Sequence, residues 1–409
     1  MPELPDLPGT LRLPARVHFG YGARAQLPEI VAGHGTRVLA VVDPFLETTP
    51  HFAAVLGALG TAGLDVRTYS EITPELPVGT LTAGAAVARD HRAEVVLAIG
   101  GGSALDAAKL IALLAVHDGP LARFYGENLV PGPVVPVVAV PTTAGTGSEV
   151  TPVAVVSDPD RELKVGISSP FLVPAAAVVD PELTLGAPAS VTAFSGIDAL
   201  VHAAESYTAR PLPLGWSAPL PVFTGRNALT EPIALQAAER LGPWLPAVVR
   251  SPGDRDARRE VALGALLAGI AFGSTGTHLC HAIQYPIGAL TKTPHGLGTG
   301  LLLPYVLDVL RAEVAERIAR LGAAVEGIPE RDASAERTVA RVAGINRAIG
   351  VPATLAEIGI GRDQLPQIAD LALKSARLLA IAPVQPTREL LLDILGRAHA
   401  GALDDRSAA

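Results

Sequence analysis

The sequence predicts an α/β protein of two domains, a doubly wound parallel sheet in residues 1–191 and an all-helical domain in residues 192–409. The first observation is the length of 409 residues. Single hydrophobic cores stop growing at about 250 to 300 residues, so a chain of this length is expected to form two domains. The second is the alternation of β-rich and helical runs in the first half, which is typical of parallel strands covered by helices on both faces. The third is that strand-like runs stop at about Thr192.

The expected elements of the first domain follow one another as strand, helix and strand. Apolar, β-rich runs predict strands within residues 37–44, 66–70, 94–103 and 134–141, with helices between them at residues 51–64, 79–91 and 104–116. In the second domain, amphipathic or wholly apolar patterns predict helices at residues 231–241, 256–272, 300–321 and 334–348. The proline-rich stretch at residues 210–225 has no helical period, so an ordered loop is expected there.

Composition and charge limit the class of partner. The chain is 49% hydrophobic, carries a formal net charge of -8 and has no run of Lys or Arg, which argues against nucleic acid or an anionic membrane surface and favours small molecules. Cys280 is the single cysteine, so no intrachain disulfide and no thiolate zinc site are expected. The N-terminal residues are acidic and proline-rich where a signal peptide needs basic and then apolar ones, so a cytoplasmic protein is expected.

A glycine-rich loop follows one of the predicted strands. Gly100, Gly101, Gly102 and Ser103 stand between the strand-like run EVVLAI and a helical run. Glycines let the backbone approach a phosphate closely, and a helix N-terminus offers free N–H groups to an anion. The G-x-G-x-x-G fingerprint is absent, since Leu105 stands where its last glycine would be. The loop predicts either a diphosphate cradle or a tight strand-to-helix turn.

Asp43 ends another predicted strand, RVLAVVD. A carboxylate there can accept both hydrogen bonds from an adenosine ribose and repel a 2′-phosphate, which would select NAD over NADP. In the usual dinucleotide fold the acid follows the glycines by about 20 residues, whereas Asp43 precedes them by a whole βαβ unit. One shared dinucleotide would therefore require a different doubly wound topology. The alternative is a capping or turn residue before Pro44.

A second glycine-rich stretch, VAVPTTAGTGSEVT, follows a further apolar strand. Beside its glycines it carries hydroxyl groups suited to phosphate and ribose, those of Thr142, Thr143, Thr146 and Ser148. Lysine is rare in this arginine-rich chain, yet Lys109 and Lys164 flank the two loops. One interpretation is that the loops need a compact ammonium group where a guanidinium would not fit. The alternative is that both are ordinary surface lysines.

The segment SGIDALVHAAESY places Asp198 and His202 four residues apart, so a helix would project both from one face. His278, His281 and His295 follow within GSTGTHLCHAIQYPIGALTKTPHGLG. One acid and several histidines form an oxygen and nitrogen site for Fe(II), Zn(II), Mn(II) or Co(II). Each histidine taken alone is more simply a core or capping residue, but a metal ion would offset the cost of burying Asp198 and His202 together.

Together these motifs resemble the iron-containing (group III) alcohol dehydrogenase family. The resemblance runs from GYGA through GGGSALDAAK, PTTAGTGSE, VVDPEL and the Asp-x-x-x-His helix to HAIQYPIGALTKTPHG. It implies a dehydroquinate synthase-like fold, with an α/β nucleotide-binding domain and a helical metal-binding domain, usually in a homodimer or larger homo-oligomer. It also implies one Fe(II) ion, or Zn(II) as the alternative, bound by Asp198, His202, His281 and His295.

The same resemblance implies cofactor and proton-transfer residues. Asp43 matches the acid that contacts the ribose, so NAD is expected rather than NADP. Further dinucleotide contacts match Gly101, Gly102, Ser103, Thr142, Thr143, Thr146 and Lys164. Where many members have a histidine that helps to move the proton, this chain has Tyr285. The proton is then expected to leave through the Tyr285 hydroxyl, through His278 in its place, or through water.

The predicted function is that of a metal-dependent NAD(H) oxidoreductase, which interconverts an alcohol or hydroxyacid with its aldehyde or ketone by hydride transfer from a metal-bound alkoxide. The run THLCHAIQYPIGAL and the insert at residues 211–234 are similar to the hydroxyacid-oxoacid transhydrogenase branch, which implies an alternative with retained NAD. Cys280 in that run is interpreted as a small buried hydrophobe. An NAD- and metal-dependent lyase or cyclase on the related scaffold is the alternative from another class.

Overall fold

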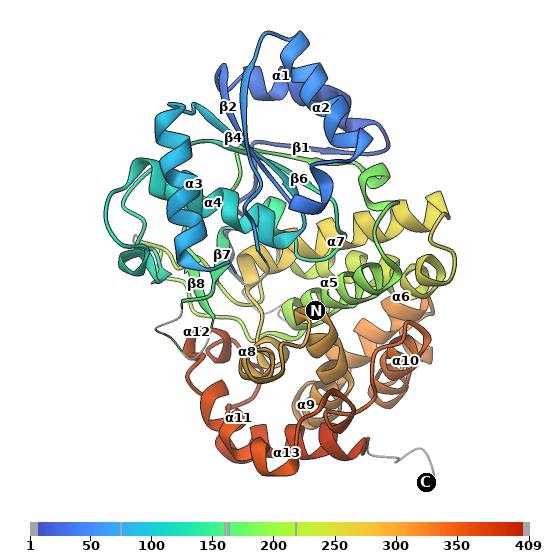
Figure 1. Cartoon of the computed structure of the whole chain (residues 1–409). Coiled ribbons are helices and arrows are strands. Elements are labelled where there is room, and N and C mark those ends of the chain that lie inside the picture. Colours follow the sequence, from blue (N-terminus) through green and yellow to red (C-terminus); the bar gives the residue numbers. More distant parts are fainter. Residues whose placement is uncertain (1–6, 74–75, 159–160, 162–163, 217–218, 404–409) are drawn as a thin grey trace. The chain divides into compact units, whose positions relative to one another are not determined.

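The computed structural model describes residues 7–73, 76–158, 161, 164–216 and 219–403, which form two compact units (Figure 1). An α/β unit holds residues 12–187, and a helical unit holds residues 7–11 and 188–403. The break after Ala187 lies close to the break that the sequence predicts after residue 191. Residues 7–11, predicted in the first domain, lie with the helices instead, where the Ala228 N–H donates to the Leu7 carbonyl at 3.1 Å.

Six parallel strands form the main sheet, in the order β1-β9-β6-β4-β2-β3. They are β1 (Arg16–Phe19), β2 (Arg37–Val42), β3 (Asp65–Tyr69), β4 (Val95–Gly100), β6 (Val137–Pro141) and β9 (Ala176–Val179). The helices of this unit are α1 (Leu27–Ala32), α2 (Pro50–Thr61), α3 (Val78–Asp90) and α4 (Gly102–Val116). A smaller sheet joins β5 (Gly126–Glu127), β8 (Val165–Ser168) and β7 (Val153–Val156). The four strands and three helices predicted in the first half are all present.

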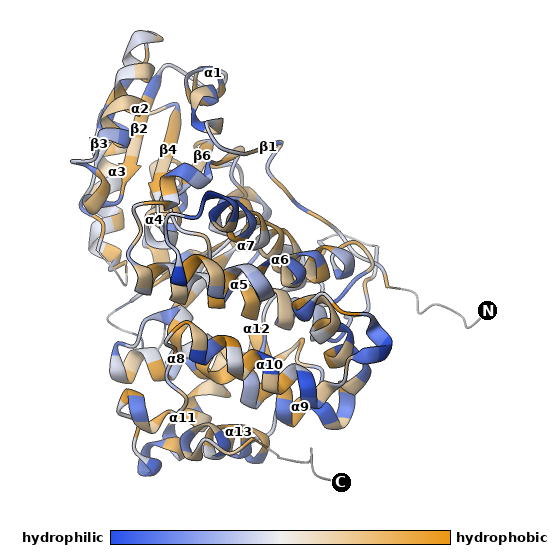
Figure 2. Ribbon diagram, turned by 90° about the vertical axis from the view of Figure 1, so that its right-hand side faces the viewer, coloured by the Kyte–Doolittle hydropathy of each residue, from blue (hydrophilic) through white to orange (hydrophobic). Residues whose placement is uncertain are grey.

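Both faces of the main sheet are covered, as the continuous apolar runs predict. Every residue of β4 and β6 is buried, and Figure 2 shows apolar residues along β2, β4 and β6. Val96 and Ala98 pack on one face with residues of α3 and α4. Leu97 and Ile99 pack on the other face with residues of α1 and α2. Burial of each such aliphatic side chain contributes roughly 1.5–3 kcal/mol.

The strand order explains how an acid that precedes the glycine loop in sequence comes to lie beside it. The order β3-β2-β4-β6-β9 is that of flavodoxin-like sheets, in which ligands bind where the chain switches direction across the sheet. Here the chain passes from β2 to β3 on one side and then crosses to β4 on the other. Val42 pairs with Ile99, so Asp43 and Gly100 meet at the carboxyl ends of β2 and β4.

Helices make up most of the second unit, and loops join them. Its helices are α5 (Ala189–Thr208), α6 (Glu231–Arg250), α7 (Arg255–Thr275), α8 (Leu279–Thr291), α9 (His295–Glu326), α10 (Ala335–Ala348), α11 (Leu365–Ala372), α12 (Ala376–Leu379) and α13 (Arg388–Ala400). The four helices predicted here are present. Helix α6 continues through Pro243 and Pro246 beyond its predicted end, because Leu245 and Val248 remain buried against the neighbouring helices.

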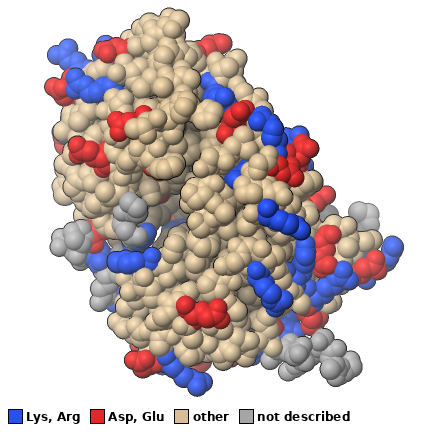
Figure 3. Space-filling view, turned by 45° about the vertical axis from the view of Figure 1, so that its right-hand side comes forward, with Lys and Arg blue, Asp and Glu red and all other residues tan. Residues whose placement is uncertain are grey.

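The proline-rich stretch is non-helical over its described residues 210–216 and 219–225, as predicted, and Pro211 and Gly225 form an antiparallel bridge. Residues 261–273 are free of charged side chains and lie in α7. Among the described residues, no single helix is long and apolar enough to cross a membrane; only α7 and α8 together, bent by 100°, meet that requirement. Cationic and anionic side chains are interspersed on the face shown in Figure 3.

Candidate functional site

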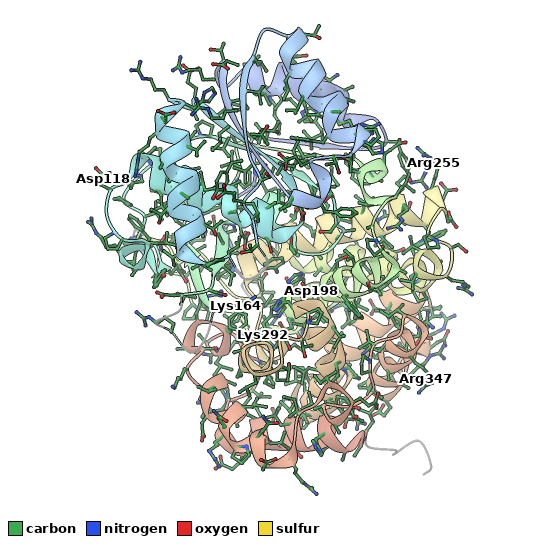
Figure 4. All side chains as sticks on the ribbon, viewed as in Figure 1. Asp118, Lys164, Asp198, Arg255, Lys292 and Arg347 are labelled. Atoms are coloured by element: carbon green, nitrogen blue, oxygen red, sulfur yellow. The ribbon has the colours of Figure 1, made fainter. Side chains whose placement is uncertain are left out.

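Helix α5 carries the acid and the first histidine of the predicted metal site on one face. Every residue from Gly196 to Thr208 is buried, and the side chains of Asp198 and His202 are only 4% and 5% exposed. The spacing of four residues brings His202 Nε2 to 3.8 Å from Asp198 Oδ2. Figure 4 labels Asp198 among the helices of this unit. The prediction that both side chains share a buried helix face is confirmed.

The other two predicted ligands reach this face from the starts of α8 and α9. His281 Nε2 lies 3.1 Å from His202 Nε2 and 3.9 Å from Asp198 Oδ1. His295, the first residue of α9, places its Nε2 3.9 Å from Asp198 Oδ1, with a side chain 38% exposed. One donor atom from each of Asp198, His202 and His281 lies within 4.8 Å of the others. The four predicted ligands therefore converge, with His295 on the accessible side.

The donor set and its spacing fit a divalent metal ion. The Nε2 atoms of His202 and His281 lie 3.1 Å apart, and such a contact is favourable only when a proton or a cation lies between the two nitrogens. For comparison, ligand atoms about 2.1 Å from a tetrahedral metal ion are about 3.4 Å from one another. Burial and the neighbouring His202 lower the pKa of His281 well below its ordinary value, so it is the neutral imidazole that binds metals. Burial alone would raise the pKa of Asp198, but the facing histidines lower it and keep the carboxylate ionised.

Each buried ligand has its own support. The Thr299 hydroxyl donates to Asp198 Oδ1 at 2.7 Å. The Phe272 ring stacks on His202, with centroids 4.1 Å apart and planes at 18°. Glu205 Oε2 lies 2.6 Å from His281 Nδ1. Glu205 was not predicted as a site residue, although its place seven residues after Asp198 puts it on the same face of α5 and offers a signal.

Close packing of α9 on α5 sets the position of His295. A Cβ atom on Gly296 would lie 2.0 Å from the Phe194 carbonyl oxygen and 3.0 Å from Asp198 Cβ, and one on Gly300 would lie 2.6 Å from the Ile197 side chain. Glycine at these two positions allows the helix backbones to approach.

The two predicted proton-transfer residues have different surroundings. His278 is buried: its Nδ1 accepts from the Leu279 N–H at 2.8 Å, and its Nε2 lies 3.0 Å from Thr208 Oγ1. Both ring nitrogens are engaged, and His278 caps α8. Tyr285 is half-buried one turn after His281, with its ring centroid 6.2 Å from that of His295. Cys280 is fully buried, as interpreted.

In the α/β unit, Asp43 and the first glycine loop lie together at the switch point of the sheet. A Cβ atom on Gly100 would lie 2.9 Å from Asp43 Cβ, and one on Gly102 would lie 2.6 Å from Thr146 Cγ2. Helix α4 begins at Gly102, so its first N–H groups face the loop end of the sheet. Asp43 Oδ1 accepts from the Phe45 N–H at 3.1 Å, so the carboxylate also caps a turn.

The second glycine-rich stretch joins this end of the sheet. The Thr142 N–H donates to the Gly100 carbonyl at 2.9 Å, and Thr143 Cγ2 lies 3.5 Å from the Cβ position of Gly101. The Ser148 hydroxyl is directed inward and donates to Asp106 at 2.5 Å. Ser103 is exposed at the start of α4.

The flanking lysines differ in burial. Lys109 is fully buried, not a surface lysine, and donates to the carbonyls of Thr151 and Val153, at 2.9 Å each. Burial lowers its pKa to about 8. Lys164 is half-buried. Burial raises the pKa of Asp106, and the charge of Lys109 opposes this shift.

Comparisons with known proteins find similar proteins over most of the chain. A family model described as "Iron-containing alcohol dehydrogenase" matches residues 14–181, and one described as "Fe-containing alcohol dehydrogenase family, C-terminal" matches residues 192–399. Long-chain-alcohol dehydrogenase 1 of Geobacillus thermodenitrificans is 34% identical over 398 residues, which cover 95% of this chain and 96% of that protein. NAD-dependent methanol dehydrogenase of Bacillus methanolicus is 34% identical over 342 residues, or 83% and 86% of the two chains. A crystal structure of a 1,3-propanediol oxidoreductase has a TM-score of 0.88 at 29% identity, covering 96% of this chain and 100% of that one.

Proposed function

Because this chain belongs to the iron-containing alcohol dehydrogenase family of alcohol and aldehyde oxidoreductases, we propose that it interconverts a small alcohol and its aldehyde with NAD and one divalent metal ion. Fe(II) is the proposed ion, with Zn(II) as the alternative. The observation that carries the proposal is the convergence of one carboxylate and three imidazoles, those of Asp198, His202, His281 and His295.

Each residue of the site has a separate proposed role. When bound, a divalent ion acts as a Lewis acid toward the substrate oxygen, and the oxidised nicotinamide accepts the hydride. Asp198 supplies the negative ligand, and Thr299 holds its carboxylate. His295 stands on the accessible side, where substrate would enter. Tyr285 is the proposed proton-transfer residue, because both nitrogens of His278 are already engaged within the protein.

NAD is proposed over NADP because of Asp43, whose carboxylate at the carboxyl end of β2 would accept from a ribose and repel a 2′-phosphate. The diphosphate is assigned to Gly100, Gly101, Gly102 and Ser103 at the N-terminus of α4. Further contacts to the dinucleotide are assigned to Thr142, Thr143, Thr146, Ser148 and Lys164. A cytoplasmic homodimer or larger homo-oligomer is proposed on the sequence analysis alone.

NADH formation by anaerobically purified, Fe(II)-loaded protein tests the proposal. The panel contains short alcohols, diols and 4-hydroxybutyrate, and the control is the double variant Asp198→Ala/His281→Ala. Metal-dependent NADH release that the variant loses is the expected result. Equal rates with and without metal would contradict it.

A hydroxyacid is the second candidate substrate, and Arg377 on α12 favours it. The Arg377 guanidinium lies 4.7 Å above the Phe223 ring and pairs with no carboxylate among the described residues. Burial and His202 lower the pKa of His281 most, and the positive charge of Arg377 adds to that lowering. Arg377→Gln should raise KM for 4-hydroxybutyrate several-fold and leave KM for 1-butanol unchanged; parallel changes in both would rule this candidate out.

The transhydrogenase and lyase alternatives predict different kinetics. Retained NAD with ping-pong turnover on addition of a 2-oxoacid would favour the transhydrogenase. Turnover without net change in NADH absorbance would favour the lyase or cyclase. The comparisons do not specifically support either one, and all three relatives named above are alcohol oxidoreductases by name.

A further inference from the structure

A second buried carboxylate, that of Glu205, lies on the same face of α5 as two of the ligands. Its side chain is 1% exposed. Oε1 accepts from the Cys280 N–H at 2.6 Å, and Oε2 accepts from the His278 N–H at 2.9 Å. Oε2 also lies 2.6 Å from His281 Nδ1. The donors around this carboxylate therefore all come from the start of α8.

Hydrogen-bond donors surround the Glu205 carboxylate. A buried carboxylate is costly unless N–H donors or cations compensate it. Here two backbone N–H groups and one ring N–H converge on it from the N-terminal end of a 13-residue helix, where the partial charge is positive. Hydrogen bonds to a charged acceptor are short and about twice as strong as neutral ones.

This contact determines which nitrogen of His281 carries the proton. An ionised carboxylate only accepts, so His281 Nδ1 must donate to Glu205, and in the neutral ring Nε2 is then left with its lone pair. That Nε2 is the atom that faces His202 Nε2 at 3.1 Å. We propose that Glu205 is a positioning residue, which fixes the tautomer and ring orientation of His281 for metal binding. The inference rests on the proposed metal-dependent function.

His202 provides an internal contrast. Its Nδ1 is buried and has no hydrogen-bond partner among the residues that the structure describes, and its ring is oriented by stacking on Phe272. The two imidazoles are thus held by different means, one by a carboxylate and one by an aromatic ring. Loss of the Glu205 carboxylate should therefore act on His281 and leave the orientation of His202 unchanged.

Glu205→Gln is the informative substitution, because an amide has one acceptor oxygen where the carboxylate has two. If the amide oxygen stays near His281, the NH₂ group opposes the Cys280 N–H. If it turns to Cys280, the NH₂ group faces His281 Nδ1 and favours the Nε2–H tautomer, which leaves no lone pair on Nε2 for a metal ion. Outer partners of metal-binding histidines contribute about 10–100-fold in metal affinity, and we expect a loss in this range.

Thr208→Val is the matched control. The Thr208 hydroxyl lies 3.0 Å from His278 Nε2 and donates to the Ala204 carbonyl at 2.7 Å. Its loss perturbs the same buried junction between α5 and α8, but it does not touch His281. If Glu205 acted only by stabilising this junction, both variants would lose metal affinity in proportion to their loss of thermal stability.

The experiment compares wild type, Glu205→Gln and Thr208→Val by three measurements: Co(II) affinity by chelator competition, the visible Co(II) spectrum, and the ¹⁵N shifts of histidine rings in metal-free protein. We expect weaker affinity, an altered spectrum and loss of the His281 Nδ1–H tautomer in Glu205→Gln alone. Unchanged affinity and tautomer in Glu205→Gln, or equal losses in Thr208→Val, would overturn the inference. If wild type bound no Co(II), the proposed function would fail, and the metal-free ¹⁵N shifts would still decide the role of Glu205.

Discussion

Replacement of Gly296 by alanine should weaken metal binding without touching any ligand. Gly296 follows His295 at the start of α9 and faces the backbone of α5. The added Cβ would lie 2.0 Å from the Phe194 carbonyl oxygen, whereas ordinary contacts begin at 3.4 Å. Both groups belong to helix backbones, so no side chain can turn away to relieve the overlap.

The magnitude follows from this overlap. Relief requires the start of α9 to move about 1 Å from α5, while metal–ligand distances hold within about 0.2 Å. His295 moves with α9 and Asp198 stays with α5, so we expect at least a tenfold loss of metal affinity, about 1.4 kcal/mol. Overpacking costs about 1–3 kcal/mol of folding stability, of which the better helix propensity of alanine returns at most about 1 kcal/mol.

The assay is Co(II) or Fe(II) titration together with thermal unfolding of the metal-free protein. Gly344→Ala in α10 is the matched control, because a Cβ atom there has nothing within 4 Å. It should keep wild-type affinity and gain about 0.5–1 kcal/mol in stability. Wild-type metal affinity and unfolding temperature in Gly296→Ala would refute the argument from helix approach.

Four further predictions concern the metal, the cofactor and pH. Removal of the metal ion by a chelator should lower the unfolding temperature, because Asp198 is then buried without its cation, and added Fe(II) or Zn(II) should restore it. An unfolding temperature that the chelator does not change would count against a metal site. Asp43→Asn should narrow the preference for NAD over NADP in binding assays, and a constant ratio would remove Asp43 from that role. Gly102→Val should weaken NAD binding at unchanged metal affinity, because its side chain would meet Thr146; undiminished NAD affinity would argue against the loop. Burial raises the pKa of Glu149 from 4.5 to about 7, so the carboxyl group stays protonated to higher pH in the folded state than in the unfolded state. The free energy of unfolding therefore falls by up to about 3 kcal/mol as the pH rises from 4.5 to 7. Glu149→Gln should flatten that fall in pH-dependent unfolding, and an unaltered slope would contradict it.

Much of the architecture could be predicted from periodicity alone. Continuous apolar runs such as those of β4 and β6 are buried on both sides of a sheet, so they identify parallel strands without knowledge of their neighbours. The spacing of Asp198 and His202 places both on one helix face by helix geometry alone. The glycines before α4 likewise indicate a turn into a helix start. These inferences succeed because they depend on local geometry.

The strand order was decided only by the tertiary structure. Periodicity identifies strands but does not say which strand pairs with which, so the position of Asp43 before the glycine loop was an open question in the sequence. Pairing of β2 with β4 answers it by placing Asp43 beside Gly100.

The fine structure of the metal site was also decided by packing. Contacts between residues far apart in sequence bring the Nε2 atoms of His202 and His281 to 3.1 Å and place His281 Nδ1 within hydrogen-bond distance of Glu205. The same packing engaged both nitrogens of His278, a residue that sequence alone leaves as a candidate for proton transfer. Residue types and local spacing thus determined which groups are available. Long-range helix contacts decided which atoms face one another, because hydrogen-bond distances depend on how separate helices meet.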